Sequence, residues 1–111
     1  MVDRTDDLPW IIERGAEYDV AILAGEDFEG NADVEVRFHD GRVFTATFFS
    51  VFSLESLFRK NKATGEFAGG RYLFCREMII VEELSTGAIM ETVADLFTTG
   101  MLDSAFSPLS D

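Results

Sequence analysis

The Asp40-Gly41 dipeptide is the feature that most constrains the fold of this chain. It separates two runs rich in β-branched and aromatic residues, residues 34–38 and 43–49. Asp-Gly between such runs favours a two-residue type I′ turn, because both central residues of that turn need a positive φ. We therefore predict an antiparallel β-hairpin closed by this turn.

The predicted turn also fixes the register of the hairpin and the two faces of its strands. A two-residue loop pairs His39 with Arg42 and Val36 with Thr45. One face is then expected to be core, with Val34, Val36, Phe38, Val43, Thr45, Thr47 and Phe49. The other face is polar near the turn and apolar further along, at Phe44, Ala46 and Phe48, where we expect a helix to cover it. With apolar residues on both faces, the second strand is expected to lie inside the sheet.

Capping residues mark the expected helices. Ser53 and Ser85 are suitable N-caps, and Gly65 and Gly100 are suitable ends. Pro9 and Gly15 favour a further short helix over residues 9–14. Phe52 is expected to pack on Leu57, and the last helix to bury one stripe, Ile89, Val93, Leu96 and Phe97.

The remaining apolar runs predict strands at residues 18–24, 72–75 and 78–81. Arg76-Glu77 is either a turn between the last two or a bulge within one strand. These elements predict an α+β fold, with a small, largely antiparallel sheet of four to five strands and helices packed on one face. The length of 111 residues suits one domain, which we place at residues 8–111 after a flexible acidic N-terminus, residues 1–7.

Cysteine content and hydropathy indicate the compartment. The one cysteine, Cys75, excludes an intramolecular disulfide and suits a reducing environment. The first ten residues lack the basic and apolar regions of a secretory signal. No apolar run approaches the ~20 residues that span a bilayer. We expect a cytoplasmic protein that makes no membrane contact.

Charge is distributed unevenly along the chain. The balance is −9 over residues 1–35, +4 over residues 36–76 and −7 over residues 77–111, which contain no lysine or arginine. A net charge of −12 repels phosphate, which argues against nucleic acid as a ligand. The same charge favours a basic protein partner, because opposite charge accelerates association.

No catalytic motif accompanies this charge, and we predict no catalytic residues, no metal and no cofactor. Cys75 is expected to be an inert core thiol and His39 an exposed residue beside the turn. The candidate partner-binding residues are carboxylates in two segments: Glu26, Asp27 and Glu29 in a glycine-bounded loop, and Glu82 and Glu83 after the strand at 78–81. Neighbours within a strand point to opposite faces, so we expect only one of Glu82 and Glu83 to face a given partner.

Several segments resemble a group of small bacterial proteins of unknown function. The resemblance rests on residues 40–46, 64–66, 70–74 and 78–82 and extends over residues 18–106. Some members of that group look like immunity proteins encoded beside secreted toxins. The resemblance implies a bacterial cytoplasmic binding protein, whose partner would be a cationic toxin such as a nuclease.

Two other interpretations remain. The chain is alternatively a structural or homo-oligomeric domain in which acidity serves solubility. Phe106 then either returns to the core or joins Phe28 and Phe67 in a self-association patch. An enzyme would require a pocket that combines His39, a carboxylate and either Tyr18 or Tyr72.

Overall fold

The computed structural model describes residues 10–24, 30–73 and 76–109. The predicted loop carboxylates Glu26, Asp27 and Glu29, the N-terminus 1–7 and Cys75 therefore lie outside the described residues. The elements in chain order are β1 (Ile11–Glu13), β2 (Tyr18–Ala24), β3 (Asn31–Phe38), β4 (Val43–Ser50), α2 (Val51–Thr64), α3 (Glu66–Gly70), β5 (Met78–Val81), α4 (Thr86–Thr99), α5 (Leu102–Ala105) and β6 (Ser107–Pro108).

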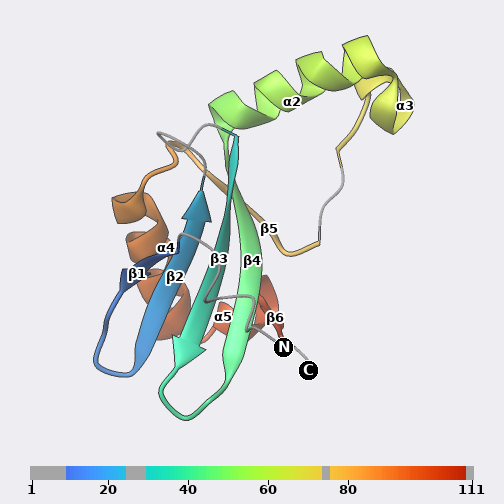
Figure 1. Ribbon diagram of the computed structural model, residues 1–111. Coiled ribbons are helices and arrows are strands. Elements are labelled where there is room, and N and C mark those ends of the chain that lie inside the picture. The colour runs from blue at the N-terminus through green and yellow to red at the C-terminus, as the bar shows by residue number, and fades with distance from the viewer. Residues whose placement is uncertain (1–9, 25–29, 74–75, 110–111) are drawn as a thin grey trace, which may run out of the picture.

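The strands form one sheet, and the predicted α+β class is confirmed. The strand order is β1-β2-β3-β4-β5, with β6 paired to β4, so the sheet has six strands where four to five were expected. Every pair is antiparallel except β4 with β5, which is parallel. As predicted, β4 lies inside the sheet, between β3 and β5 (Figure 1).

The hairpin between β3 and β4 forms, but with a three-residue loop. The Gly41 N–H donates to the Phe38 carbonyl at 3.0 Å, and the Phe38 N–H donates to the Arg42 carbonyl at 2.8 Å. Gly41 has a φ of 103°, whereas Asp40 is not among the non-glycine residues with positive φ. The predicted type I′ turn is therefore wrong, and glycine serves at the last position of a longer loop.

The extra loop residue shifts β4 by one position against β3. Val36 pairs with Phe44 instead of Thr45. Because side chains alternate along a strand, this shift exchanges the two faces of β4. Ala46 and Phe48 are buried in the core, while Thr45 and Thr47 lie on the opposite face. The predicted core face was thus correct for β3 and wrong for β4.

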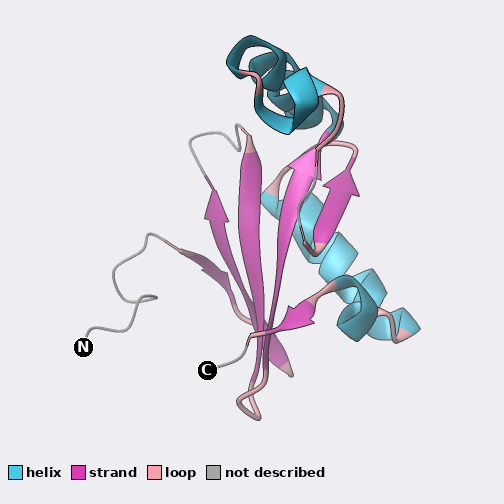
Figure 2. Cartoon of the chain, turned by 90° about the vertical axis from the view of Figure 1, so that its right-hand side faces the viewer, coloured by secondary structure: helices cyan, strands magenta, loops and turns pink. Residues whose placement is uncertain are grey.

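Helix α4 covers the core face of the sheet (Figure 2). It has the predicted caps, with Ser85 accepting from the Ala88 N–H at 3.0 Å and Gly100 in the left-handed conformation. Its Ile89 and Val93 are fully buried. Phe106 is buried as well, with its ring 6.0 Å from that of Phe48, so it belongs to the core and not to a self-association patch.

Two predicted elements differ from the secondary structure that is observed. Residues 11–13 form strand β1 instead of a helix, because β1 pairs antiparallel with β2 along Ile11, Ile12 and Glu13. Tyr72 and Leu73 are not in a strand, while Phe74 and Cys75 fall outside the described part of the chain. Arg76 and Glu77 form a turn before β5, with Glu77 at a φ of 50°, but no described strand precedes this turn, so it is neither the predicted turn between two strands nor a bulge within one.

Helix α2 leaves the end of β4 and projects beyond the sheet, with α3 at its far end (Figure 1). Its N-cap is Ser50 and not Ser53; the two serines form a reciprocal capping box. Phe52 is 73% exposed, so the predicted packing of Phe52 on Leu57 is wrong. None of the helices within the described ranges is long and apolar enough to cross a membrane.

Candidate functional site

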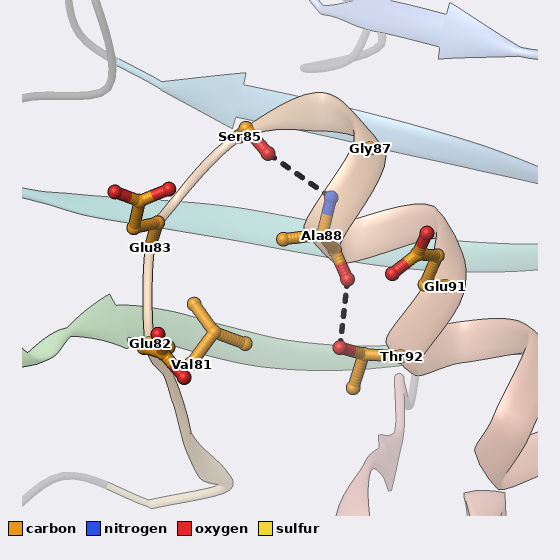
Figure 3. A pocket seen from close by; sticks show the side chains of 8 residues that line it. All are labelled: Val81, Glu82, Glu83, Ser85, Gly87, Ala88, Glu91 and Thr92. Atoms are coloured by element: carbon orange, nitrogen blue, oxygen red, sulfur yellow. Dashed lines mark hydrogen bonds between the residues drawn. The ribbon is translucent and has the colours of Figure 1, made fainter.

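An open pocket of about 480 Å³ lies where β5 ends and α4 begins (Figure 3). Its walls come from three consecutive pieces of chain: the last residue of β5, the connecting loop and the first two turns of α4. The lining residues are Val81, Glu82, Glu83, Ser85, Gly87, Ala88, Glu91 and Thr92. We call this the acidic pocket, because all its charged side chains are carboxylates.

Local hydrogen bonds hold the frame of the acidic pocket. The Ser85 hydroxyl accepts from the Ala88 N–H at 3.0 Å, which fixes the start of α4. The Thr92 hydroxyl donates to the Ala88 carbonyl at 2.7 Å, one turn further along. Val81 anchors the other wall through its parallel pairing with Ser50 on β4. Glu82 and Glu83 thus directly follow the end of a strand, and Glu91 lies in a capped helix.

Glu82 and Glu83 both line the acidic pocket (Figure 3), although we expected from strand alternation that only one of them would face a given partner. That expectation assumed the alternation of a strand. Strand β5 ends at Val81, so the two glutamates occupy a bend where alternation no longer applies. Both are exposed.

Glu91 is the third carboxylate of the acidic pocket, and the sequence analysis did not select it. It is an exposed residue of α4. Helical spacing places it on the same side as Gly87 and Ala88, four and three positions earlier. The Ser85 cap therefore indicates which residues of α4 share a side with Glu91, but the position of that side next to Glu82 and Glu83 depends on how α4 packs on the sheet.

Three arginines in or next to the sheet strands form ion pairs with neighbouring carboxylates. Arg14 pairs with Asp19 at 3.0 Å, Arg37 with Glu35 at 2.9 Å, and Arg42 with Asp40 at 2.9 Å. Across residues 10–24, 30–73 and 76–109, no ion pair involves a carboxylate of the acidic pocket. Five further basic residues belong to α2 or follow α3: Arg59, Lys60, Lys62, Arg71 and Arg76.

The acidic pocket does not have the arrangement of a metal site. Within the described residues, no group of three or more His, Cys, Asp or Glu side chains is placed to hold a metal ion. Ca²⁺ and Mg²⁺ need several oxygen ligands converging at about 2.0–2.6 Å. The chemistry that these carboxylates offer is instead attraction to an extended positive surface.

His39 lies beside the β3–β4 turn and is exposed, as predicted. Its Nε2 is 3.1 Å from Oδ1 of Asp19. Tyr18 does not join this pair, because its ring packs against Phe38 and Phe97 at 5.5 and 5.2 Å on the core face. Asp19 follows Tyr18 in β2 and therefore points to the other face.

The hydrogen bond from His39 is the main cause that lowers the pKa of the Asp19 carboxyl. The Gly15 N–H and the charges of His39 and Arg14 lower this pKa further, while desolvation opposes them. A carboxyl whose pKa is lower in the folded state stabilises the fold above its ordinary pKa. That contribution is lost as the pH falls through the folded-state value.

We expect His39→Ala to raise the pKa of Asp19 toward its ordinary value, because the largest stabilising contact is removed. Titration of the Asp19 carboxyl carbon by NMR measures the change. Arg14→Ala is the matched comparison and should raise the pKa less, since its charge contributes least. A larger rise in Arg14→Ala than in His39→Ala would contradict the assignment.

The acidic pocket thus combines the predicted pair Glu82 and Glu83 with Glu91, which was not predicted. Its interpretation depends on its own chemistry and on the distribution of charge around it. In comparisons with protein families, curated proteins and solved structures, nothing matches this chain.

Proposed function

We propose that this protein is an acidic protein-binding module that recognises a basic protein through the acidic pocket. The observation that carries the proposal is the exposure of Glu82, Glu83 and Glu91 around one pocket. Because these carboxylates are unpaired, no intramolecular ion pair has to break when a partner's cations approach, and ion pairs that stay in contact with water avoid most of the desolvation cost of buried charges. A surface of this kind suits a charged partner better than an apolar ligand.

The separation of charge within the molecule supports the same proposal. The arginines in or next to the sheet strands are paired locally, and the other described bases lie in the segment from α2 to the turn before β5. Residues 77–111 contain seven carboxylates and no lysine or arginine. A partner that approaches α4 therefore meets a negative field, which speeds encounter most at low ionic strength.

The partner class that we propose is a cationic toxin, with a nuclease as the leading case. A nuclease must present lysine and arginine to bind phosphate, so an acidic inhibitor can occupy the same surface. This choice follows from the resemblance of several segments to small bacterial proteins of unknown function, some of which look like immunity proteins. In that role the protein binds the basic surface of the toxin and keeps nucleic acid away from it.

Glu82 and Glu83 also have a structural interpretation. They lie just before the start of α4, where negative charge is favourable to the helix dipole. Glu91 is a useful discriminator, because it lies beyond the first turn, where the dipole effect has decayed. A role for Glu91 in binding would not be explained by helix stability.

The test is the rate of association with a panel of purified, catalytically inactivated basic nuclease domains. We expect at least one to bind, and Glu82→Lys/Glu83→Lys/Glu91→Lys to slow its association by about 10- to 1,000-fold. The matched control reverses three exposed carboxylates elsewhere, Glu17→Lys/Glu66→Lys/Asp103→Lys. It produces the same change in net charge and should slow association much less.

Surface plasmon resonance at several salt concentrations measures these rates. The wild-type association rate should fall as salt rises, and the triple variant at the acidic pocket should lose most of that dependence. Equal slowing by both triple variants would assign the effect to net charge and not to the pocket. Binding that none of these substitutions or salt concentrations alters would overturn the proposal.

A further inference from the structure

Helix α2 has an unusual burial pattern for a helix of a small domain. Its two buried residues are polar, Ser53 and Asn61. In contrast, Val51 and Phe52 are 50% and 73% exposed. The helix projects beyond the sheet (Figure 1), and helices of this length are marginal in water without a packed face. Its apolar base is therefore available to a partner.

The far end of the arm formed by α2 and α3 contains features that cost stability. Asn61 is 3% exposed, and its Nδ2 has no hydrogen-bond partner. Phe67 and Ala68 have left-handed φ values of 51° and 55°. Unpaired buried polar atoms and left-handed non-glycine residues are both unfavourable, and such features often mark functional elements. The arm thus contains destabilising features at its far end and exposed apolar side chains at its base.

Charge changes sign along the arm. At its base, Ser50 pairs with Val81, and Glu82 and Glu83 follow Val81 directly. The second half of α2 carries Arg59, Lys60 and Lys62. The 14 residues of α2 separate these two ends by about 21 Å. The base of the arm is therefore negative and its far half positive.

We infer that α2 is a self-association element whose partner is α2 of a second copy of this chain, packed antiparallel across a two-fold axis. In this arrangement the basic half of each α2 lies against Glu82 and Glu83 of the other copy. Both contacts form at once because a two-fold interface is reciprocal. A parallel pair would place like charges together, so charge fixes the orientation.

The exposed apolar residues give this contact its packing surface. Val51 and Phe52 lie at the base of α2, where the far half of the second α2 would cover them. Ile80, which is 55% exposed, pairs with Phe49 just before this base and extends the same corner. The net charge of −12 opposes association at long range, but at physiological salt charges beyond about 8 Å are largely screened. The oppositely charged ends meet at shorter range.

The decisive experiment exchanges charge between two copies. Arg59→Glu/Lys60→Glu/Lys62→Glu makes the arm acidic, and Glu82→Lys/Glu83→Lys makes the base basic. Sedimentation velocity should show a dimer for the wild type and a monomer for each variant alone. An equimolar mixture of the two variants should form a dimer, because each altered arm meets an oppositely charged base. A mixture that stays monomeric would overturn the inference.

A second variant tests the apolar contact. Phe52→Asp should raise the dimer dissociation constant at least about thirtyfold, because it removes the same apolar anchor from both copies. Met101→Asp is the control, since Met101 is 50% exposed but follows α4, away from the arm. It should leave the dissociation constant unchanged. Circular dichroism establishes that both variants are folded. A wild type that remains monomeric to millimolar concentration would also overturn the inference.

This inference can fail without affecting the proposed function. The variant with the acidic arm keeps Glu82, Glu83 and Glu91, so it should remain monomeric and still bind the basic nuclease domain. Loss of nuclease binding in that variant would show that the arm itself contacts the partner, and would contradict a role for α2 limited to self-association.

Discussion

Replacing Phe48 with alanine is expected to lower the free energy of unfolding by about 3–5 kcal/mol. Phe48 is fully buried in the centre of the sheet, and its ring contacts that of Phe106 at 6.0 Å. Removing the ring loses its transfer free energy and leaves a cavity that rigid strands on both sides cannot close. Domains of this size have a total stability of about 5–15 kcal/mol, so the loss is a large fraction.

Phe52→Ala is the matched control for this prediction. Phe52 lies four positions further along the chain but is 73% exposed, so the same substitution should change stability by at most about 0.5 kcal/mol. Urea unfolding followed by circular dichroism, in dilute protein, compares the two variants. Similar losses in both would contradict the burial of Phe48 in the core and the exposure of Phe52.

The hairpin illustrates how far sequence reasoning reaches. The two strands and their turn were predictable, because β-branched and aromatic runs around Asp-Gly are a local signal. The loop length was not, since Asp40 and Gly41 fit the last two positions of a three-residue loop as well as a type I′ turn. A one-residue difference in the loop then reversed every side chain of β4. The register depends on the whole core, to which Phe48 and Ala46 contribute.

The ends of the helices were predicted better than the type of the N-terminal element. Ser85, Gly65 and Gly100 were identified correctly, because a cap is satisfied by residues within one turn of it. Residues 11–13 form a strand because β2 offers a free edge to pair with, which no local signal could reveal. Local chemistry therefore predicts where a helix stops more reliably than whether a short segment forms one.

In the acidic pocket, too, some features follow from local sequence and others from contacts distant in sequence. Glu82 and Glu83 were predictable as a carboxylate pair after a strand. Their meeting with Glu91 depends on how α4 packs back across the sheet, which involves contacts distant in sequence. The projection of α2 was equally hidden, because its leucines and Phe58 suggest an ordinary packed helix. Only the structure reveals that Phe52 points to solvent.

Replacing Gly70 with alanine is expected to have the second largest effect, a loss of about 2–5 kcal/mol in the stability of the arm. Gly70 has a φ of 81°, and a β-carbon there would lie 2.7 Å from the Phe58 carbonyl oxygen and 2.9 Å from the Lys62 nitrogen. Both atoms are backbone, so they cannot move aside without bending α2. The new methyl group should therefore separate the end of α3 from α2.

Gly69→Ala is the control that separates this clash from conformational strain. Gly69 has a φ of 70°, close to that of Gly70, but a β-carbon there would meet nothing within 4 Å. Alanine should cost only the left-handed conformation, about 1–2 kcal/mol. Amide hydrogen exchange at Gly65 and Arg71, whose N–H groups donate to Asn61 and Phe67, reports on the arm directly. Exchange should accelerate far more in Gly70→Ala, and equal acceleration in both variants would show that α3 does not pack against α2 at this point.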